Sequence, residues 1–249
     1  MTETGDVARG TLGTVRNAVL LLDLLTDGPA YQQLTDLADR SGLSVPTVHR
    51  LLRSLVLADL VEQDARSSRY SLGPEVTRLS HRYLARLPIL GALSPYLVSL
   101  RDSLQSTIQV AVLVRATVVY VDRVDGADGG PYRDSHRVAA ALSTASGRLL
   151  AARADDDVWK QAVAAAADGD VDVDDATRQS WAGATHLVSP PLGLGTPGEV
   201  AVPVIDAAGR PVAALAAALA APDDETAAAQ TAAHLARAAV AAGRTLGHG

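Results

Sequence analysis

Basic and hydroxyl side chains gather on one side of a helix that the sequence predicts from Ser44 onward. Apolar residues mark the opposite side, because they recur at three- and four-residue steps: Val48, Leu51, Leu52 and Leu55. The polar side and its flank carry Ser44, Pro46, Thr47, His49, Arg50 and Arg53. Arginine can bond to O6 and N7 of guanine in the major groove, and a helix N-terminus suits a phosphate. These residues therefore predict contact with double-stranded DNA.

The predicted roles within this set differ. We expect Arg50 and Arg53 to reach base edges, and Thr47 to touch a thymine methyl group or a phosphate. Ser44, at the start of the helix, suits a phosphate. Two roles stay open for His49, namely packing at the edge of the core and contact with DNA.

Two further helices are needed to position this one. The first contains Val15 to Leu25 at helical spacing and ends at Asp27-Gly28-Pro29. The second runs from about Gln33 to Arg40 and is followed by the turn Ser41-Gly42-Leu43. Short helices joined by a glycine turn to a basic third helix predict a helix-turn-helix.

Two short strands follow, around a polar loop. Residues 60–64 and 69–72 are the expected strands, and Arg66 and Arg69 are placed to contact phosphates or the adjacent minor groove. The sequence thus predicts a winged helix-turn-helix over residues 12–73, preceded by a disordered tail over residues 1–11.

A linker helix is expected over residues 74–94, and a following helix before the second domain contains Leu93, Leu97, Leu100 and Leu104. The apolar residues of the linker helix recur at three- and four-residue steps: Val76, Leu79, Tyr83, Leu87 and Leu90. We expect this seam to make a dimer contact, and the alternative is packing onto the chain's own domain.

The pattern then changes to β-branched and apolar runs, which predict strands. Residues 95–249 are expected to form an α+β domain with a largely antiparallel sheet. The expected strands cover residues 107–114, 117–123, 136–141, 200–206 and 211–219, and the expected helices cover residues 144–153, 155–167 and 222–243.

Charge is divided unevenly along the chain. The formal net charge is −6, yet residues 40–86 hold eight arginines against four acidic residues. A basic block beside an acidic region is typical of a DNA-binding module joined to another domain, and a solvated helical surface is the alternative.

Composition and motifs argue against an enzyme. The absence of cysteine excludes disulfides, thiolate zinc sites and a cysteine nucleophile. The six histidines show no metal-binding spacing, and no Gly-x-Ser-x-Gly motif occurs. We therefore expect no catalysis, no metal and no cofactor. Without a signal peptide or an apolar run of about 18 residues, the prediction is a cytoplasmic protein with no membrane contact.

Three motifs in order resemble the IclR family of bacterial transcriptional regulators. They are RNAVLLLDLL at residues 16–25, GLSVPTVHRLL at residues 42–52 and RYSLGP at residues 69–74. The second domain is similar at residues 107–124, 142–152 and 200–206. The resemblance implies a GAF-like effector-binding domain over residues 95–249 and a homodimer or homotetramer.

The resemblance also implies an effector site, formed by Leu142, Thr144, Ala145, Ser146, Glu199, Ala216 and Ala218. Family members that bind small carboxylic acids use backbone amides at the position of Ala145-Ser146, together with a cysteine and two serines. Those last three positions hold Glu199, Ala216 and Ala218 in this chain. A buried carboxylate would repel an acid ligand. We therefore expect a larger apolar or cationic ligand, or a domain that has lost effector sensing.

Together these expectations describe a sequence-specific transcriptional regulator, a repressor, that binds a pseudo-palindromic operator. A small molecule other than a simple carboxylate would modulate its operator affinity. The alternative is a DNA-binding regulator or architectural protein with a vestigial, ligand-free sensor domain.

Overall fold

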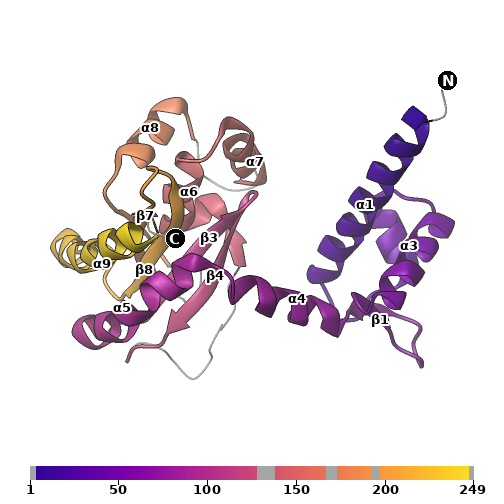
Figure 1. Cartoon of the computed structure of the whole chain (residues 1–249), viewed down its shortest axis with the longest axis horizontal. Coiled ribbons are helices and arrows are strands. Elements are labelled where there is room, and N and C mark those ends of the chain that lie inside the picture. Colours follow the sequence, from indigo (N-terminus) through magenta and orange to yellow (C-terminus); the bar gives the residue numbers. More distant parts are fainter. Residues whose placement is uncertain (1–3, 128–137, 167–172, 192–196, 247–249) are drawn as a thin grey trace. The chain divides into compact units, whose positions relative to one another are not determined.

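The computed structural model describes residues 4–127, 138–166, 173–191 and 197–246. Contacts divide the chain into two compact units, Met1–Arg86 and Leu87–Gly249. Figure 1 shows the first unit as helices with a small hairpin beside them, and the second as a larger sheet covered by helices. The architecture is α+β, as expected, with a helix-turn-helix in the first unit and an antiparallel sheet in the second.

The first unit is a winged helix-turn-helix. Leu21, Leu37 and Leu52 of the helices are fully buried, and Val61 and Tyr70 of the hairpin belong to the same apolar core. Gly42 ends the second helix with φ 67°, a left-handed conformation that glycine adopts without a Cβ clash. The elements are α1 (Thr4–Thr26), α2 (Leu34–Ser41), α3 (Val45–Leu57), β1 (Val61–Gln63), β2 (Tyr70–Leu72) and α4 (Pro74–Leu84).

The start of α1 differs from the sequence prediction. The helix begins at Thr4, whereas residues 1–11 were expected to be a disordered tail. Extending an existing helix adds one hydrogen bond per residue without a new nucleation step. No proline interrupts this segment, so the helix continues toward the N-terminus from its packed part.

The linker helix expected over residues 74–94 ends earlier than predicted, and the helix that follows it begins earlier. Helix α4 ends at Leu84, and a new helix, α5 (Pro88–Leu104), begins after an extended Leu87 with φ −78° and ψ 106°. Proline disfavours the helical conformation in the residue before it, so Pro88 breaks the helix.

No single described helix is long and apolar enough to cross a membrane. Helices α4 and α5 meet the length and composition required only when they are taken together as a bent pair.

The break at Pro88 divides the expected dimer seam. Leu79 and Tyr83 are 48% and 59% exposed on α4, and Val76 is partly exposed beside them. Leu87 and Leu90 instead pack against the core of the second unit.

A six-stranded antiparallel sheet forms the centre of the second unit, in the order β5-β4-β3-β8-β7-β6. Both predicted hairpins are present, whereas β6 and α8 were not predicted. The elements after α5 are β3 (Ile108–Val114), β4 (Thr117–Val124), β5 (Val138–Ala140), a 3₁₀ helix η1 (Ala141–Ser143), α6 (Ala145–Ala152), α7 (Asp156–Ala166), α8 (Asp175–Gly183), β6 (Leu187–Ser189), β7 (Gly198–Ile205), β8 (Pro211–Leu219) and α9 (Glu225–Thr245). His136 and Arg137, the start of one expected strand, lie outside the described residues.

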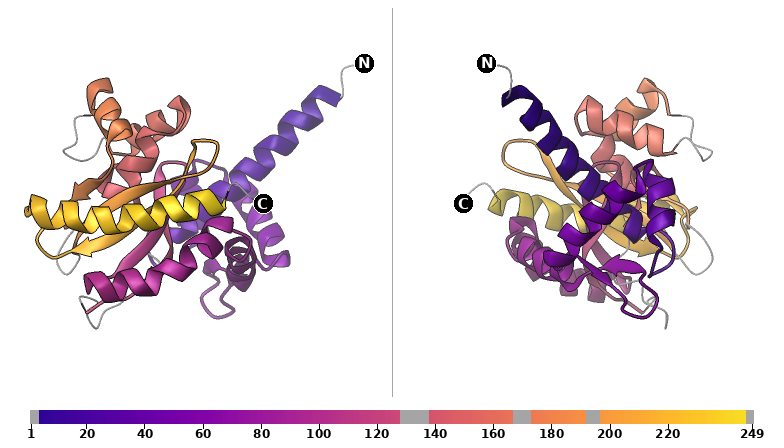
Figure 2. Two further views of the ribbon diagram at one scale, coloured as in Figure 1. Left: turned by 60° about the vertical axis from the view of Figure 1, so that its left-hand side comes forward. Right: turned by 90° about the vertical axis from the view of Figure 1, so that its right-hand side faces the viewer.

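Helices cover both faces of this sheet. Helices α5 and α9 lie side by side on one face, as both views in Figure 2 show, and bury Val200, Val202 and Val204 of β7. Helix α6 packs on the other face against Ala201 and Ala216. Successive residues of a strand point to opposite faces. Glu199, two residues before Ala201, therefore lies on the α6 face.

Close approach of α9 to the sheet depends on Gly243. A methyl group at this position would lie 2.1 Å from the carbonyl oxygen of Ile205. We expect Gly243→Ala to lower the free energy of unfolding by about 2 kcal/mol, because helix and strand must move apart. Urea unfolding followed by circular dichroism measures this change.

Gly91→Ala is the matched control within helix α5. No atom lies within 4 Å of a methyl group placed there. Alanine should therefore raise the free energy of unfolding by about 0.5–1 kcal/mol through helix propensity alone. Equal effects of the two substitutions would contradict the close packing of α9.

Candidate functional site

The polar face of α3 is accessible over its whole length. The side chains of Ser44, Pro46, His49, Arg50 and Arg53 are exposed, and Thr47 is partly exposed. The opposite face, with Val48 and Leu52, is fully buried. The structure therefore places His49 outside the core, which removes core-edge packing as its role.

None of the four arginines predicted to contact DNA is engaged elsewhere. Arg50 and Arg53 on α3, and Arg66 and Arg69 in the wing, are exposed, and their guanidinium groups make no hydrogen bond or ion pair with another described residue. Ser44 lies at the N-cap of α3, but its hydroxyl pairs with the Thr47 hydroxyl at 2.9 Å rather than with a helix amide. A phosphate can therefore approach the amides at this end of α3.

The wing loop is held by one carboxylate. Asp64 accepts hydrogen bonds through Oδ2 from the backbone nitrogen of Ser67 at 2.7 Å and from its hydroxyl at 2.5 Å. The backbone nitrogen of Asp64 donates to the carbonyl of Arg69 at 2.9 Å. The bonds from Ser67 lower the pKa of Asp64. They fix the loop that carries Arg66 between the two strands.

A buried glutamine, not predicted from the sequence, ties the helices to the wing. Gln32 is 3% exposed, and its amide donates to the carbonyls of Leu24 and Asp27 at 3.0 Å each. Its side-chain oxygen accepts from Arg40 at 2.7 Å, and its backbone pairs with Tyr70 of β2. Gln32 thus joins the end of α1, helix α2 and the hairpin that presents the wing.

The second candidate site lies at the N-terminus of α6. The backbone nitrogen of Ser146 donates to Oε1 of Glu199 at 2.7 Å. The hydroxyl of Tyr120 donates to Oε2 of the same carboxylate. Thr144 caps the helix, since its hydroxyl oxygen accepts from the nitrogen of Gly147 at 3.0 Å. Glu199 is 4% exposed, so this carboxylate is held inside the protein.

The structure brings together most of the predicted effector residues. Ala218 is the cross-strand partner of Glu199, and Ala216 packs with Ala145 under α6. Leu142 instead packs into a separate cluster with Trp159 of α7. Sequence reasoning missed Tyr120, which lies in the middle of a β-strand run that gave no sign of a polar role.

Cations and tryptophans alternate around α6, α7 and α8. Arg178 lies over the ring of Trp159 at 5.2 Å, Trp159 meets Trp181 edge-on at 6.3 Å, and Arg148 lies over Trp181 at 5.3 Å. Arg148 also donates to the carbonyl of Leu142 at 2.8 Å. Burial lowers the pKa of Arg148, whereas the negative charge of Glu199 opposes this shift. The Arg–Trp stack therefore connects the two outer helices to the Glu199 site.

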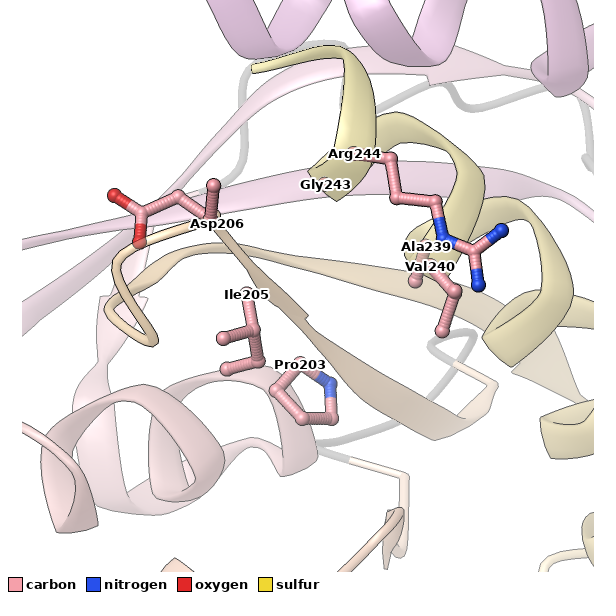
Figure 3. A pocket seen from close by; sticks show the side chains of 8 residues that line it. Pro203, Ile205, Asp206, Ala239, Val240, Gly243 and Arg244 are labelled. Carbon is pink, nitrogen blue, oxygen red and sulfur yellow. The ribbon is translucent and has the colours of Figure 1, made fainter. Parts of the chain in front are cut away.

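A groove of about 310 Å³ lies elsewhere, between the end of β7 and α9 (Figure 3). Ile205, Val240 and Gly243 supply its apolar wall, and Asp206 and Arg244 lie at its rim. Asp206 is bound to Arg210, whose backbone hydrogen bond lowers the pKa of Asp206. None of the predicted effector residues lines this groove.

A winged helix-turn-helix followed by a helix-covered antiparallel sheet defines the architectural class of the chain. Residues 14–65 match the sequence profile of the IclR helix-turn-helix domain. The glycerol operon regulatory protein of Streptomyces coelicolor is 32% identical over 142 residues, which cover 56% of this chain and 55% of that protein. The chain thus spans about half the length of the curated relatives it matches.

Solved structures agree over nearly the whole chain. A protein from a Silicibacter species, assigned as an IclR transcriptional regulator, is 25% identical with a TM-score of 0.76, covering 95% of this chain and 97% of that one. An IclR homologue of Microbacterium hydrocarbonoxydans, in complex with 4-hydroxybenzoate, is 21% identical with a TM-score of 0.65, covering 92% and 97%. The chain is therefore similar to IclR-family regulators, in its helix-turn-helix domain by sequence and over nearly its whole length by fold. Its curated relatives are transcriptional regulators, not enzymes.

The lowered pKa of Asp64 predicts that the stability of the fold depends on pH. The pKa of Asp64 is lower in the folded state than in the unfolded state, so the ionised carboxylate stabilises the fold. This stabilisation is complete above the pKa of the unfolded state and is lost as the pH falls through the pKa of the folded state. Ser67→Ala removes one of the two bonds and should raise the pKa of Asp64. Carboxyl-detected NMR titration measures it. Ser68→Ala is the control, since no hydrogen bond of the Ser68 hydroxyl to Asp64 exists, and it should leave the pKa unchanged.

Proposed function

We propose that this chain is a sequence-specific DNA-binding transcriptional regulator, a repressor, that acts in the cytoplasm. The observation that carries this proposal is the uncommitted arginine set on α3 and the wing, formed by Arg50, Arg53, Arg66 and Arg69. The match of residues 14–65 to the IclR helix-turn-helix domain supports it.

In this proposal α3 contacts the base edges, and the wing fixes the position of the protein on the DNA. Arg50 and Arg53 would bond to guanine edges in the major groove, with His49 and Thr47 beside them. Ser44, Pro46 and the N-terminus of α3 would lie along the phosphate backbone, together with Arg66 and Arg69. A pseudo-palindromic operator requires two such modules, separated by one or more turns of about 34–36 Å.

Two modules require a dimer, and α4 offers a surface for one. Val76, Leu79 and Tyr83 lie on one stripe of α4, and α4 has no buried residue in the single chain. We place a dimer contact on this stripe, in a homodimer or a homotetramer. Leu87 and Leu90 do not extend it, because they pack inside the second unit.

The second unit would act as the sensor through thermodynamic linkage. A ligand changes operator affinity only by its differential affinity for two arrangements of the domains. An IclR homologue of similar fold forms a complex with 4-hydroxybenzoate, which supports small-molecule binding by this chain. A sensor domain that no longer binds a ligand is the second candidate, favoured by the internally bonded carboxylate of Glu199.

Selection from a random DNA library separates base reading from backbone contact. Wild-type protein should enrich one pseudo-palindromic motif. Arg50→Ala should lose the preference for one base pair in each half-site, because about 1–3 kcal/mol of discrimination against the other bases is removed. Arg66→Ala and Arg69→Ala should weaken all sequences alike, and each should lower the slope of log K against log salt by about 1.

Arg210→Ala is the matched control, since it removes the same charge from the β7–β8 hairpin of the other unit. It should leave both motif and salt slope unchanged. The absence of any enriched motif at low salt would overturn the proposal, and an altered base preference in Arg66→Ala would reverse the assigned roles.

The dimer contact has its own test. Leu79→Asp places a charge in the apolar stripe of α4 and should shift the protein toward monomers in analytical ultracentrifugation. Thr77→Asp adds the same charge to another, exposed side of α4 and should not. If both variants sediment like the wild type, α4 does not hold the dimer together.

A further inference from the structure

A carboxylate of the chain itself occupies the N-terminus of α6. The first amides of a helix lack partners within the helix, and the helix dipole adds partial positive charge there. Such a terminus binds carboxylates and phosphates from ligands. In this chain the Ser146 amide is taken by Oε1 of Glu199, which reaches it from β7.

Packing alone does not account for a glutamate at this position. The neighbouring positions of β7 and β8 that face α6 are alanines, namely Ala201, Ala216 and Ala218. A buried carboxylate is costly unless charge and hydrogen bonds compensate it. Tyr120 donates to the second oxygen, and the Arg148 guanidinium attracts the same charge. The surroundings of Glu199 are therefore those of an anion site.

A buried hydroxyl group without a hydrogen-bond partner lies at the same helix terminus. The hydroxyl of Ser146 is fully buried and has no hydrogen-bond partner among the described residues. Buried hydroxyls are normally paired, so an unpaired one beside a filled anion position marks a site with spare hydrogen-bonding capacity.

We infer that Glu199 is a tethered anion that takes the place of a ligand carboxylate at the N-terminus of α6, and so closes this site to small carboxylates. This inference rests on the proposed function, in which the second unit is the sensor. It makes Glu199 the residue that determines ligand class. Its removal should convert a carboxylate-insensitive site into one that binds small monocarboxylates.

Glu199→Ala tests the inference by chemical rescue in the full-length protein. The variant loses the carboxylate and leaves space beside the Ser146 amide. Sodium acetate at 100 mM should raise its Tm by about 3–5 °C over the same concentration of sodium chloride, because binding to the native state stabilises it. Wild type should show no acetate-specific shift.

Glu199→Gln is the matched control. It keeps the shape of the side chain and removes the charge, so it leaves no space and should show no rescue. A wild-type shift equal to that of Glu199→Ala, or no shift in Glu199→Ala, would overturn the inference. If Glu199→Ala does not purify folded, it is refolded in acetate or chloride. Recovery of helical circular dichroism in acetate alone supports the inference, and equal recovery contradicts it.

A second readout locates the acetate. Both tryptophans of the chain lie in the Arg–Trp stack, and Arg148 links Trp181 to the Glu199 site. Acetate should therefore change the tryptophan fluorescence of Glu199→Ala saturably, and leave that of Glu199→Gln unchanged. A response shared by both variants would place acetate elsewhere.

Operator binding separates this inference from the proposed function. If both hold, acetate changes the operator affinity of Glu199→Ala at least several-fold and leaves the wild type unaffected. Acetate rescue without a change in operator affinity supports the tethered anion and contradicts sensor coupling. Acetate-sensitive operator binding by wild type contradicts the tethered anion and supports coupling.

Discussion

The interior of this protein contains few aromatic side chains, and this constrains how closely its helices must pack against its sheet. The chain has no phenylalanine, and aromatic residues make up 3% of it. A dense core made of Ala, Val and Leu requires helices and strands to approach closely, since few side chains can fill a wide gap. Gly243 against Ile205 and α6 against Ala201 and Ala216 are the result. The same closeness lets Glu199 on a strand reach the amide of Ser146 on a helix.

The two units use polar groups in different ways. In the first, Gln32 and Arg40 satisfy backbone carbonyls and lock the helices to the wing, while the arginines of α3 stay free. In the second, arginines are drawn inward: Arg153 donates to the carbonyls of Trp181 and Ala184, and Arg178 donates to that of Ala154. One residue type therefore provides an exposed binding surface in one unit and internal structure in the other.

Local patterns were sufficient for most elements of the fold. Apolar spacing predicted α2, α3, α6, α7 and α9, and alternating runs predicted both hairpins. The break at Pro88 was missed because the seam from Val76 to Leu90 keeps its helical spacing across it. The residues of that seam differ in burial, because some pack into the second unit and others do not. Helical spacing alone does not show which unit a residue packs into. Strand β6 and helix α8 are short and gain their order from packing against β7 and α6.

The candidate sites were predictable to different extents. The face of α3 follows from one helical repeat, so its exposed residues could be assigned from the sequence. The Glu199 site joins residues from β4, α6 and β7, as Tyr120 and Ser146 are far apart in sequence from Glu199. The resemblance placed Glu199 near the site, but only the three-dimensional structure shows that its carboxylate is already bonded there.

The choice of arginine for the α3 and wing surface has a chemical consequence. The sequence contains one lysine, Lys160, and it lies on α7 in the other unit. Lysine acetylation removes positive charge, and it has no target on the surface formed by Arg50, Arg53, Arg66 and Arg69. Acyl donors that neutralise lysines therefore leave the positive charge of these four arginines in place.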